Sequence, residues 1–274
     1  MRGTNQIDSY SQLHFIFAFL QFVSAVIIAI MQANILQLVF LLLLAHILSA
    51  LISLLFCIIK IPRFIKNLFI FPNKIISLAR QSFIIGIIGS LRLLYERLAI
   101  TIFPLLADLS TTGLLSASVR VMDATKLGYI AIFTPLYPEM ARDKKILSHQ
   151  TGLRLLLLSA TFASLIIFLT AKYVIQFLFG VEFESATSAL QILAWTLPFY
   201  VIVSYYSLGF LAIELEKPVL ISLTISLLGL LIMLMVLNQL YGLVGGALAV
   251  LSAEILQASL LFIQWRKYAF SKLS

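Results

Sequence analysis

Long apolar runs constrain this chain more than any other feature of its sequence. When the sequence is divided wherever charge, proline or glycine interrupts, the surviving runs have about the 20 residues that a helix needs to cross a bilayer. Strands of a membrane barrel would instead alternate with period two, whereas stretches such as Phe40–Ala45 are continuously apolar. We therefore predict an all-α integral membrane protein with about eight transmembrane helices. They cover Leu13–Met31, Ile35–Ile59, Phe83–Leu106, Leu114–Met140, Leu155–Phe179, Ala189–Ile213, Val219–Leu240 and Leu243–Trp265.

Composition excludes several other classes of protein. The chain is 62% hydrophobic and only 11% charged, whereas soluble domains are about 45–50% apolar and about 25% charged. The single Cys57 forms neither an internal disulfide nor a thiolate cluster, and the histidines are too dispersed for a helical metal pair. There is no HExxH motif, nucleophile elbow, P-loop or pair of carboxylates in a loop. We expect no catalytic residue, no metal and no cofactor, and hence not an enzyme.

The basic residues predict the orientation in the membrane. The net charge of +8 would suggest nucleic acid in a soluble protein, but here 14 of the 19 Lys and Arg residues fall on one side of the predicted spans. Since basic loops stay in the cytoplasm, both termini are expected to be cytoplasmic, with no nucleic-acid partner. The 14 are Arg2, Lys60, Arg63, Lys66, Lys74, Arg80, Arg142, Lys144, Lys145, Arg154, Lys217, Arg266, Lys267 and Lys272.

The predicted domain organisation follows from the long connection after the second span. We expect two transmembrane helices in residues 1–60, a cytoplasmic interfacial linker in 61–81 and a six-helix lobe in 82–274. Apolar residues of the linker recur at helical spacing with basic residues between them, which suits a helix lying in the membrane interface. We interpret the linker as an anchored spacer.

Charged residues inside the predicted spans are the candidates for function. Arg92 and Arg97 lie in the third span, and Arg120 and Lys126 lie in the fourth. Each charge facing lipid at mid-bilayer would cost about 2.5–3.5 kcal/mol, so these groups must face an interior, a partner or water. Acidic residues accompany them, namely Glu96 in the third span, Asp123 in the fourth and Glu254 in the last.

Spacing indicates how these charges are shared. Arg92 and Glu96 are four residues apart and stack on one helix face, whereas Arg97 lies on a different face. Asp123 stands three residues from both Arg120 and Lys126. The two spans thus hold four cations and two acids, and the surplus is suited to bind an anion such as a phosphate or carboxylate. The alternative is that the long basic side chains snorkel to the interface.

Three further features have simpler interpretations. Glu254 is either a proton-coupling group or a neutral, hydrogen-bonded acid, and the sequence leaves both open. The GxxxG at 242–246 is typical of close helix packing, and Pro198 predicts a kink in the sixth span. Tyr200, Tyr205 and Tyr206 are more typical of an interfacial aromatic belt than of a platform for sugar rings.

Several segments resemble the C-terminal lobe of Wzx-type polysaccharide flippases, of the multidrug/oligosaccharidyl-lipid/polysaccharide exporter superfamily. The stretches 97–104 and 112–120, ending in Thr134–Pro138, resemble the helix pair that opens this lobe. The stretches 177–186 and 190–194 resemble the loop after its third helix and the helix that follows. The similarity extends from about Arg2 to the end of the chain.

The sequence departs from this family in two residues and in length. The family usually has Asp just after the arginine that matches Arg97, where this chain has Leu98 and Ala99, and it commonly has Tyr at the position of Leu115. Proteins of this family resemble two six-helix lobes around a central cationic cavity. The first two spans of this chain resemble the last two helices of the N-terminal lobe, and the other six resemble a complete C-terminal lobe. The resemblance therefore implies that the first four helices are missing here.

Together these observations predict a flippase of the bacterial inner membrane. The resemblance implies translocation of undecaprenyl-diphosphate-linked O-antigen or polysaccharide repeat units, with Arg92, Arg97, Arg120 and Lys126 binding the diphosphate. Glu96, Asp123 and Glu254 would serve as ion-coupling or structural acids. The expected partners are the lipid-linked oligosaccharide, membrane lipids, and other O-antigen assembly proteins or a separate four-helix N-terminal segment. The alternatives are a non-transporting remnant, a subunit of a split flippase, or a membrane-embedded enzyme of polysaccharide assembly.

Overall fold

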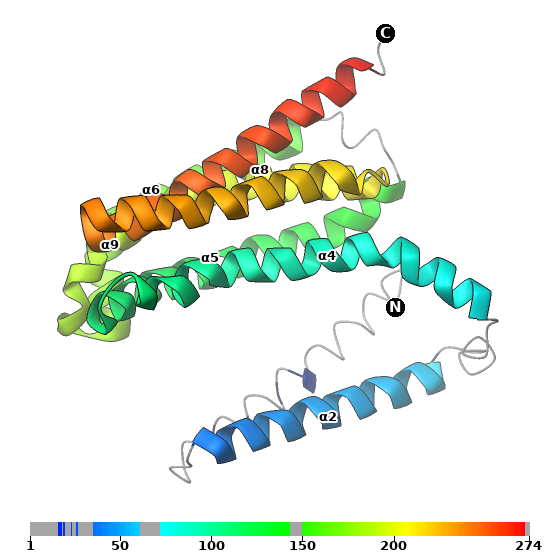
Figure 1. Cartoon of the computed structure of the whole chain (residues 1–274), viewed down its shortest axis with the longest axis horizontal. Coiled ribbons are helices and arrows are strands. Elements are labelled where there is room, and N and C mark those ends of the chain that lie inside the picture. Colours follow the sequence, from blue (N-terminus) through cyan, green and yellow to red (C-terminus); the bar gives the residue numbers. More distant parts are fainter. Residues whose placement is uncertain are drawn as a thin grey trace. The chain divides into compact units, whose positions relative to one another are not determined.

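The computed structural model describes residues 35–60, 72–142 and 150–271, with five isolated positions between 16 and 26. These described residues form helices, and no strand occurs among them, which confirms the predicted all-α fold (Figure 1). The chain divides into two compact units, residues 1–78 and 79–274. This boundary falls within the predicted linker, whose residues 61–71 lie outside the described part of the chain.

The first unit contains helix α2 (Ile35–Lys60), which coincides with the second predicted span. Most of its large apolar side chains with a described environment are exposed, and Ala45 is buried. The span predicted over Leu13–Met31 lies mostly outside the described residues, although the ring of Phe17 meets that of His46 edge to face at 5.2 Å between centroids. An exposed apolar helix of this length is typical of a segment surrounded by lipid.

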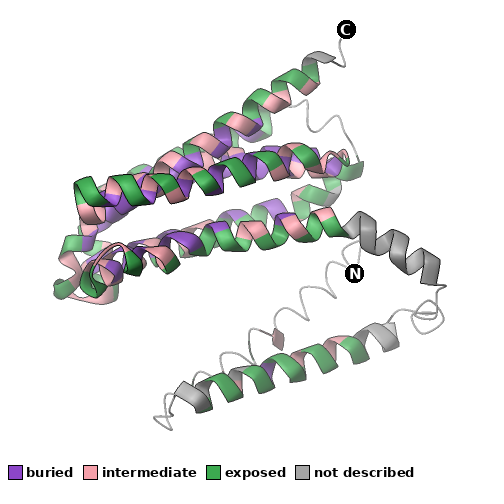
Figure 2. Cartoon of the chain, viewed as in Figure 1, coloured by how far each residue is buried: buried purple, intermediate pink, exposed green. Residues whose placement is uncertain are grey.

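The second unit contains the remaining helices. Helix α4 (Pro72–Ile102) covers most of the third predicted span but begins 11 residues before it and ends four residues before its predicted end. Helices α5 (Leu109–Arg142) and α6 (Gln150–Phe179) contain the fourth and fifth predicted spans. Helix α4 begins in the first unit, and residues 72–81 of the predicted linker are part of this continuous helix. Buried residues line the inner faces of these helices and exposed residues their outer faces (Figure 2).

The sixth predicted span is not one continuous helix. It is divided into α7 (Thr187–Ala194) and α8 (Thr196–Ala212), which meet at Trp195 with a bend of 40°. Pro198 explains the break, because proline has no N–H to donate to the carbonyl of Ala194, four residues earlier. The hydroxyl of Ser164 on α6 donates to that carbonyl at 2.7 Å instead, so the buried oxygen keeps a hydrogen-bond partner.

A 3-10 helix, η4 (Val181–Ala186), leads into α7. It follows Gly180, whose φ of +92° suits glycine best. The hydroxyl of Ser118 on α5 donates to the carbonyl of Ala186 at 3.0 Å, where the 3-10 helix ends. Buried serines on neighbouring helices thus satisfy backbone carbonyls at both irregular points of this segment.

The last two predicted spans form one element, α9 (Glu216–Ser271), which turns back on itself at Gly242. Gly242 has φ +52° and ψ −124°, a conformation that L-residues with side chains rarely adopt. The close packing expected of the GxxxG motif occurs at its second glycine, Gly246, and at the neighbouring Gly245. A Cβ at Gly246 would lie 2.5 Å from Cε2 of Phe103, which belongs to the short 3-10 helix η2 (Phe103–Leu105), and one at Gly245 would collide with the backbone at Leu237.

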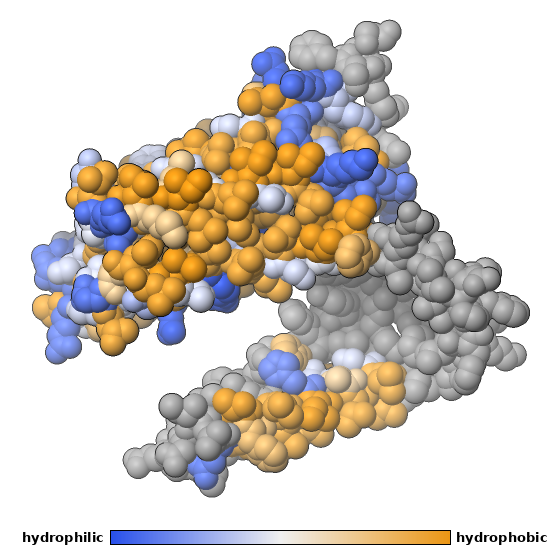
Figure 3. All heavy atoms as spheres, viewed as in Figure 1, coloured by the Kyte–Doolittle hydropathy of each residue, from blue (hydrophilic) through white to orange (hydrophobic). Residues whose placement is uncertain are grey.

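The surface of the second unit is strongly apolar (Figure 3). Large side chains are exposed along the outside of α6, among them Leu155, Leu158, Phe162, Leu169 and Phe177. Within the described part of the chain, Thr151–Phe179 and Glu216–Ala269 are long and apolar enough to cross a membrane, and the bent pair α7 and α8 adds a third candidate. These features support a membrane protein, while the total of eight spans stays a prediction.

Candidate functional site

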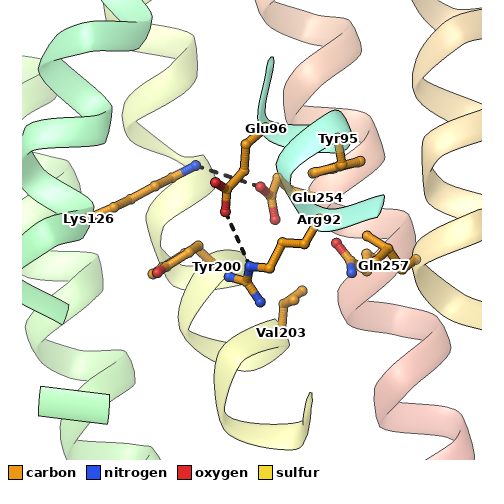
Figure 4. A pocket seen from close by; sticks show the side chains of 9 residues that line it. Arg92, Tyr95, Glu96, Lys126, Tyr200, Val203, Glu254 and Gln257 are labelled. Atoms are coloured by element: carbon orange, nitrogen blue, oxygen red, sulfur yellow. Dashed lines mark hydrogen bonds and ion pairs between the residues drawn. The ribbon is translucent and has the colours of Figure 1, made fainter. Parts of the chain in front are cut away.

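Helices α4, α5, α8 and α9 bring charged and aromatic side chains together inside the second unit (Figure 4). The side chains come from segments far apart in the sequence and converge on one small pocket. Those that line it are Arg92, Tyr95, Glu96, Lys126, Tyr200, Val203, Leu223, Glu254 and Gln257. Four of the seven charged residues that the sequence predicted for function therefore belong to this pocket.

The innermost ion pair joins α5 to α9. Lys126 Nζ lies 3.7 Å from Glu254 Oε1, and the two side chains are only 18% and 6% exposed. This distance exceeds the roughly 2.7–2.9 Å of a direct charge-assisted hydrogen bond, so the lysine is paired but not tightly clamped. The small residues beside Glu254 explain how a carboxylate is accommodated at a helix interface, since Ala253 and Ala258 are fully packed there.

Tyr200 on α8 lies beneath two cations. Lys126 Nζ is 5.1 Å from the centroid of the Tyr200 ring, and the guanidinium carbon of Arg92 is 5.9 Å from it. Both distances fall within the range of a cation–π interaction, which is strengthened where the cation is shielded from water. Tyr200 is buried, and its ring is the aromatic group that both cations approach.

The predicted pair of Arg92 and Glu96 forms on one face of α4, with Nε donating to Oε1 at 3.2 Å. Both side chains are partly exposed, at 38% and 44%. Tyr95 lies beside them, and its buried hydroxyl has no hydrogen-bond partner among the residues that the structure describes. The Tyr95 hydroxyl thus adds a polar atom to a pocket lined mainly by charged side chains.

Arg97 and Asp123 form a second contact between α4 and α5, at 3.8 Å between Nη1 and Oδ2. Arg97 is exposed, with 69% of its side chain accessible. Asp123 thus contacts Arg97, and it also interacts electrostatically with Lys126, three residues further along α5. Arg120 is exposed on α5 and makes no ion pair within residues 35–60, 72–142 and 150–271.

The structure changes the predicted balance of charge. Among the candidate residues, the third and fourth spans contain four basic and two acidic residues, which is a surplus of two positive charges. Glu254, which comes from the last span, pairs with Lys126 and makes it four cations against three acids, a sum of +1. Within the part of the chain that the structure describes, Arg120, which is exposed on α5, is the cation of the seven that has no acidic partner.

The space between the pocket side chains is about 20 Å³, enough for about one water molecule. A diphosphate or a sugar ring does not fit between these side chains in this conformation. Among the described residues, no group of three or more His, Cys, Asp or Glu side chains is arranged to hold a metal ion. An anion would therefore have to bind where the side chains move apart or at the exposed cations of α4 and α5.

Sequence reasoning missed the role of the aromatic residues. Tyr200, Tyr205 and Tyr206 are buried rather than arranged in an exposed belt. Tyr206 packs against Trp265 and Phe262, with ring centroids 5.6 and 6.0 Å apart, in an aromatic cluster between α8 and the end of α9. Helical spacing gave one usable signal for the pocket, because Gln257 lies three residues after Glu254 and so shares its face.

No family model and no curated protein matches the sequence. Among solved structures, the lipid II flippase MurJ in an inward closed conformation is similar to this chain, with a TM-score of 0.68 and 20% sequence identity. The similarity covers 92% of this chain and 54% of that protein, so the chain spans about half the length of the flippase. At this identity the likeness shows the fold alone, so this chain shares the helical fold of about half of that flippase.

Proposed function

We propose that the chain is part of a flippase that moves a lipid-linked saccharide from the cytoplasmic to the periplasmic leaflet of the bacterial inner membrane. The proposed substrate is an undecaprenyl-diphosphate-linked repeat unit of O-antigen or another polysaccharide. The observation that carries the proposal is the set of cations on two adjacent helices of a transporter fold. The similarity to a flippase of a lipid-linked substrate and the resemblance to polysaccharide flippases support the same class of substrate.

The arrangement of the cations suits an anionic headgroup attached to a membrane lipid. Arg97 and Arg120 are exposed on α4 and α5, while Arg92 and Lys126 lie deeper beside Tyr200. A diphosphate carries oxygens that accept bidentate hydrogen bonds from guanidinium groups, whereas the lysine acts as a point charge. We propose that the exposed arginines meet the headgroup first and that the inner cations bind it when the pocket widens.

Charge reversal tests this proposal. Arg97→Glu and Lys126→Glu should each abolish surface O-antigen in a strain that lacks its own flippase and depends on the transporter containing this chain. The reason is that each change places a negative charge against the substrate. Immunoblots of the membrane fraction check that each variant is still present.

Lys217→Glu is the matched control, because Lys217 is an exposed cation at the start of α9 and lies outside the pocket. It should leave surface O-antigen unchanged. Arg97→Lys should be more harmful than Lys126→Arg, since lysine cannot make the bidentate contact. Full complementation by the double variant Arg97→Glu with Lys126→Glu would refute anion binding and leave snorkelling as the explanation of these residues.

A second candidate is that the chain acts as one subunit of a split flippase. The observation that favours it is that the chain spans about half the length of the similar solved flippase. Complementation by this chain alone would contradict the candidate. Complementation only when a separate polypeptide with the other half of such a fold is co-expressed would support it.

A further inference from the structure

We propose that Glu254 is an internal counter-ion that competes with the anionic headgroup for Lys126 and thereby allows the headgroup to be released. This inference rests on the proposed function and assigns a specific role to one acid of the site. A transport site must bind its cargo well enough to admit it and weakly enough to let it leave. The position of Glu254 is suited to the second of these requirements.

The geometry around Lys126 supports competition rather than a fixed structural pair. Glu254 is nearly fully buried, and its carboxylate reaches Lys126 at 3.7 Å, longer than a direct hydrogen bond. The lysine has a second favourable contact with the ring of Tyr200, at 5.1 Å from its centroid. Lys126 therefore keeps one favourable contact when an incoming anion takes the place of the carboxylate.

The other charged groups that line the pocket come from α4, and Asp123 on α5, which contacts Arg97, also interacts electrostatically with Lys126 from outside the pocket lining. Arg92 is engaged by Glu96 at 3.2 Å, on the more exposed side of the pocket. Glu254 is thus the acid that neutralises the inner cation where water screens least, so it opposes a bound anion most strongly. In the present conformation the pocket has a volume of about 20 Å³, which fits a state in which Lys126 is paired with Glu254 and no anion is bound.

Removing the charge of Glu254 distinguishes a counter-ion from an acid with only a structural role. Glu254→Gln keeps the size and hydrogen-bonding capacity of the side chain but removes its charge. It should tighten the binding of a diphosphate and at the same time reduce transport, because the headgroup is no longer displaced. An acid with only a structural role would give the opposite sign, since its loss would loosen the pocket and weaken binding.

The test uses farnesyl diphosphate and farnesyl monophosphate as probes, bound to the purified 274-residue chain in detergent and measured by isothermal titration calorimetry. Glu254→Gln should lower the Kd of the diphosphate by about tenfold, which corresponds to about 1.4 kcal/mol of binding free energy. The effect should be smaller for the monophosphate, because the repulsion removed scales with the charge of the ligand. Surface O-antigen in the complementation strain should fall although the protein is present.

Glu184→Gln is the matched control, because it breaks an exposed ion pair with Lys172, at 2.6 Å, away from the pocket. It should change neither Kd. If Glu254→Gln does not remain monodisperse in gel filtration, Glu254→Asp takes its place. The shorter side chain withdraws the carboxylate from Lys126, and an intermediate tightening is expected.

The outcomes separate this inference from the proposed function. If the wild type binds the diphosphate and Lys126→Gln weakens that binding, the anion site stands. Equal or weaker binding by Glu254→Gln, or by Glu254→Asp in its place, would then overturn the counter-ion role alone. If neither wild type nor variant binds either probe, the proposed anion site is wrong and the inference falls with it.

Discussion

Replacing Gly246 by alanine tests the closest packing contact in the lobe. A Cβ at this position would lie 2.5 Å from Phe103 Cε2 and 3.2 Å from Leu115 Cδ2, whereas carbon atoms prefer separations of about 3.5–4.0 Å. Both neighbours are fully buried, so neither can move aside into open space. Overpacking of this kind costs about 1–3 kcal/mol, while alanine in a helix gains about 1 kcal/mol over glycine. We therefore expect Gly246→Ala to lower the free energy of unfolding by about 0–2 kcal/mol.

The assay is thermal unfolding of the purified chain in detergent, followed by gel filtration of the fraction that stays monodisperse. Gly128→Ala in α5 is the matched control, because its added Cβ meets nothing within 4 Å and should stabilise the helix. The double variant Phe103→Leu with Gly246→Ala should be less destabilised than the sum of the two single variants, because the two sites are in contact. Equal stability of Gly246→Ala and Gly128→Ala would show that the contact is not as close as the structure indicates.

Three other predictions address orientation, a helix cap and the ring of Tyr200. Alkaline phosphatase fused after Leu240 should be active and after Lys267 inactive, and the reverse result would contradict cytoplasmic termini. Asp108→Ala should lower the thermal unfolding temperature at neutral pH, because Asp108 Oδ2 accepts a hydrogen bond from the backbone N–H of Thr111 at 3.0 Å. Hydrogen bonds from the hydroxyl and backbone of Thr111 lower the pKa of Asp108, so the difference from wild type should persist down to acid pH. It should vanish as the pH falls through that lowered pKa, and a difference that persists below it would contradict the cap. Tyr200→Phe should support surface O-antigen and Tyr200→Leu should reduce it, since only the ring attracts both cations; equal activity of the two variants would argue against that role.

The sequence by itself determined the all-α membrane fold and the location of most helices. Apolar runs are local signals, and helical hydrogen bonds join residues four apart, so the chain alone predicts where α4, α5 and α6 lie. The pair of Arg92 and Glu96 was equally accessible to sequence reasoning, because its spacing of four residues lies within one helix. Pro198 likewise predicted that its helix would bend.

Only the tertiary structure decided which charges meet across helices. The partner of Lys126 is Glu254, which lies 128 positions later in the chain, and the partner of Arg97 is Asp123 on the next helix. The rotation of each helix about its axis decides these pairs, and this rotation depends on how all the buried side chains pack together. The same holds for Tyr200, whose position beneath two cations follows from the packing of α8 against α5 and α9 and from no local pattern.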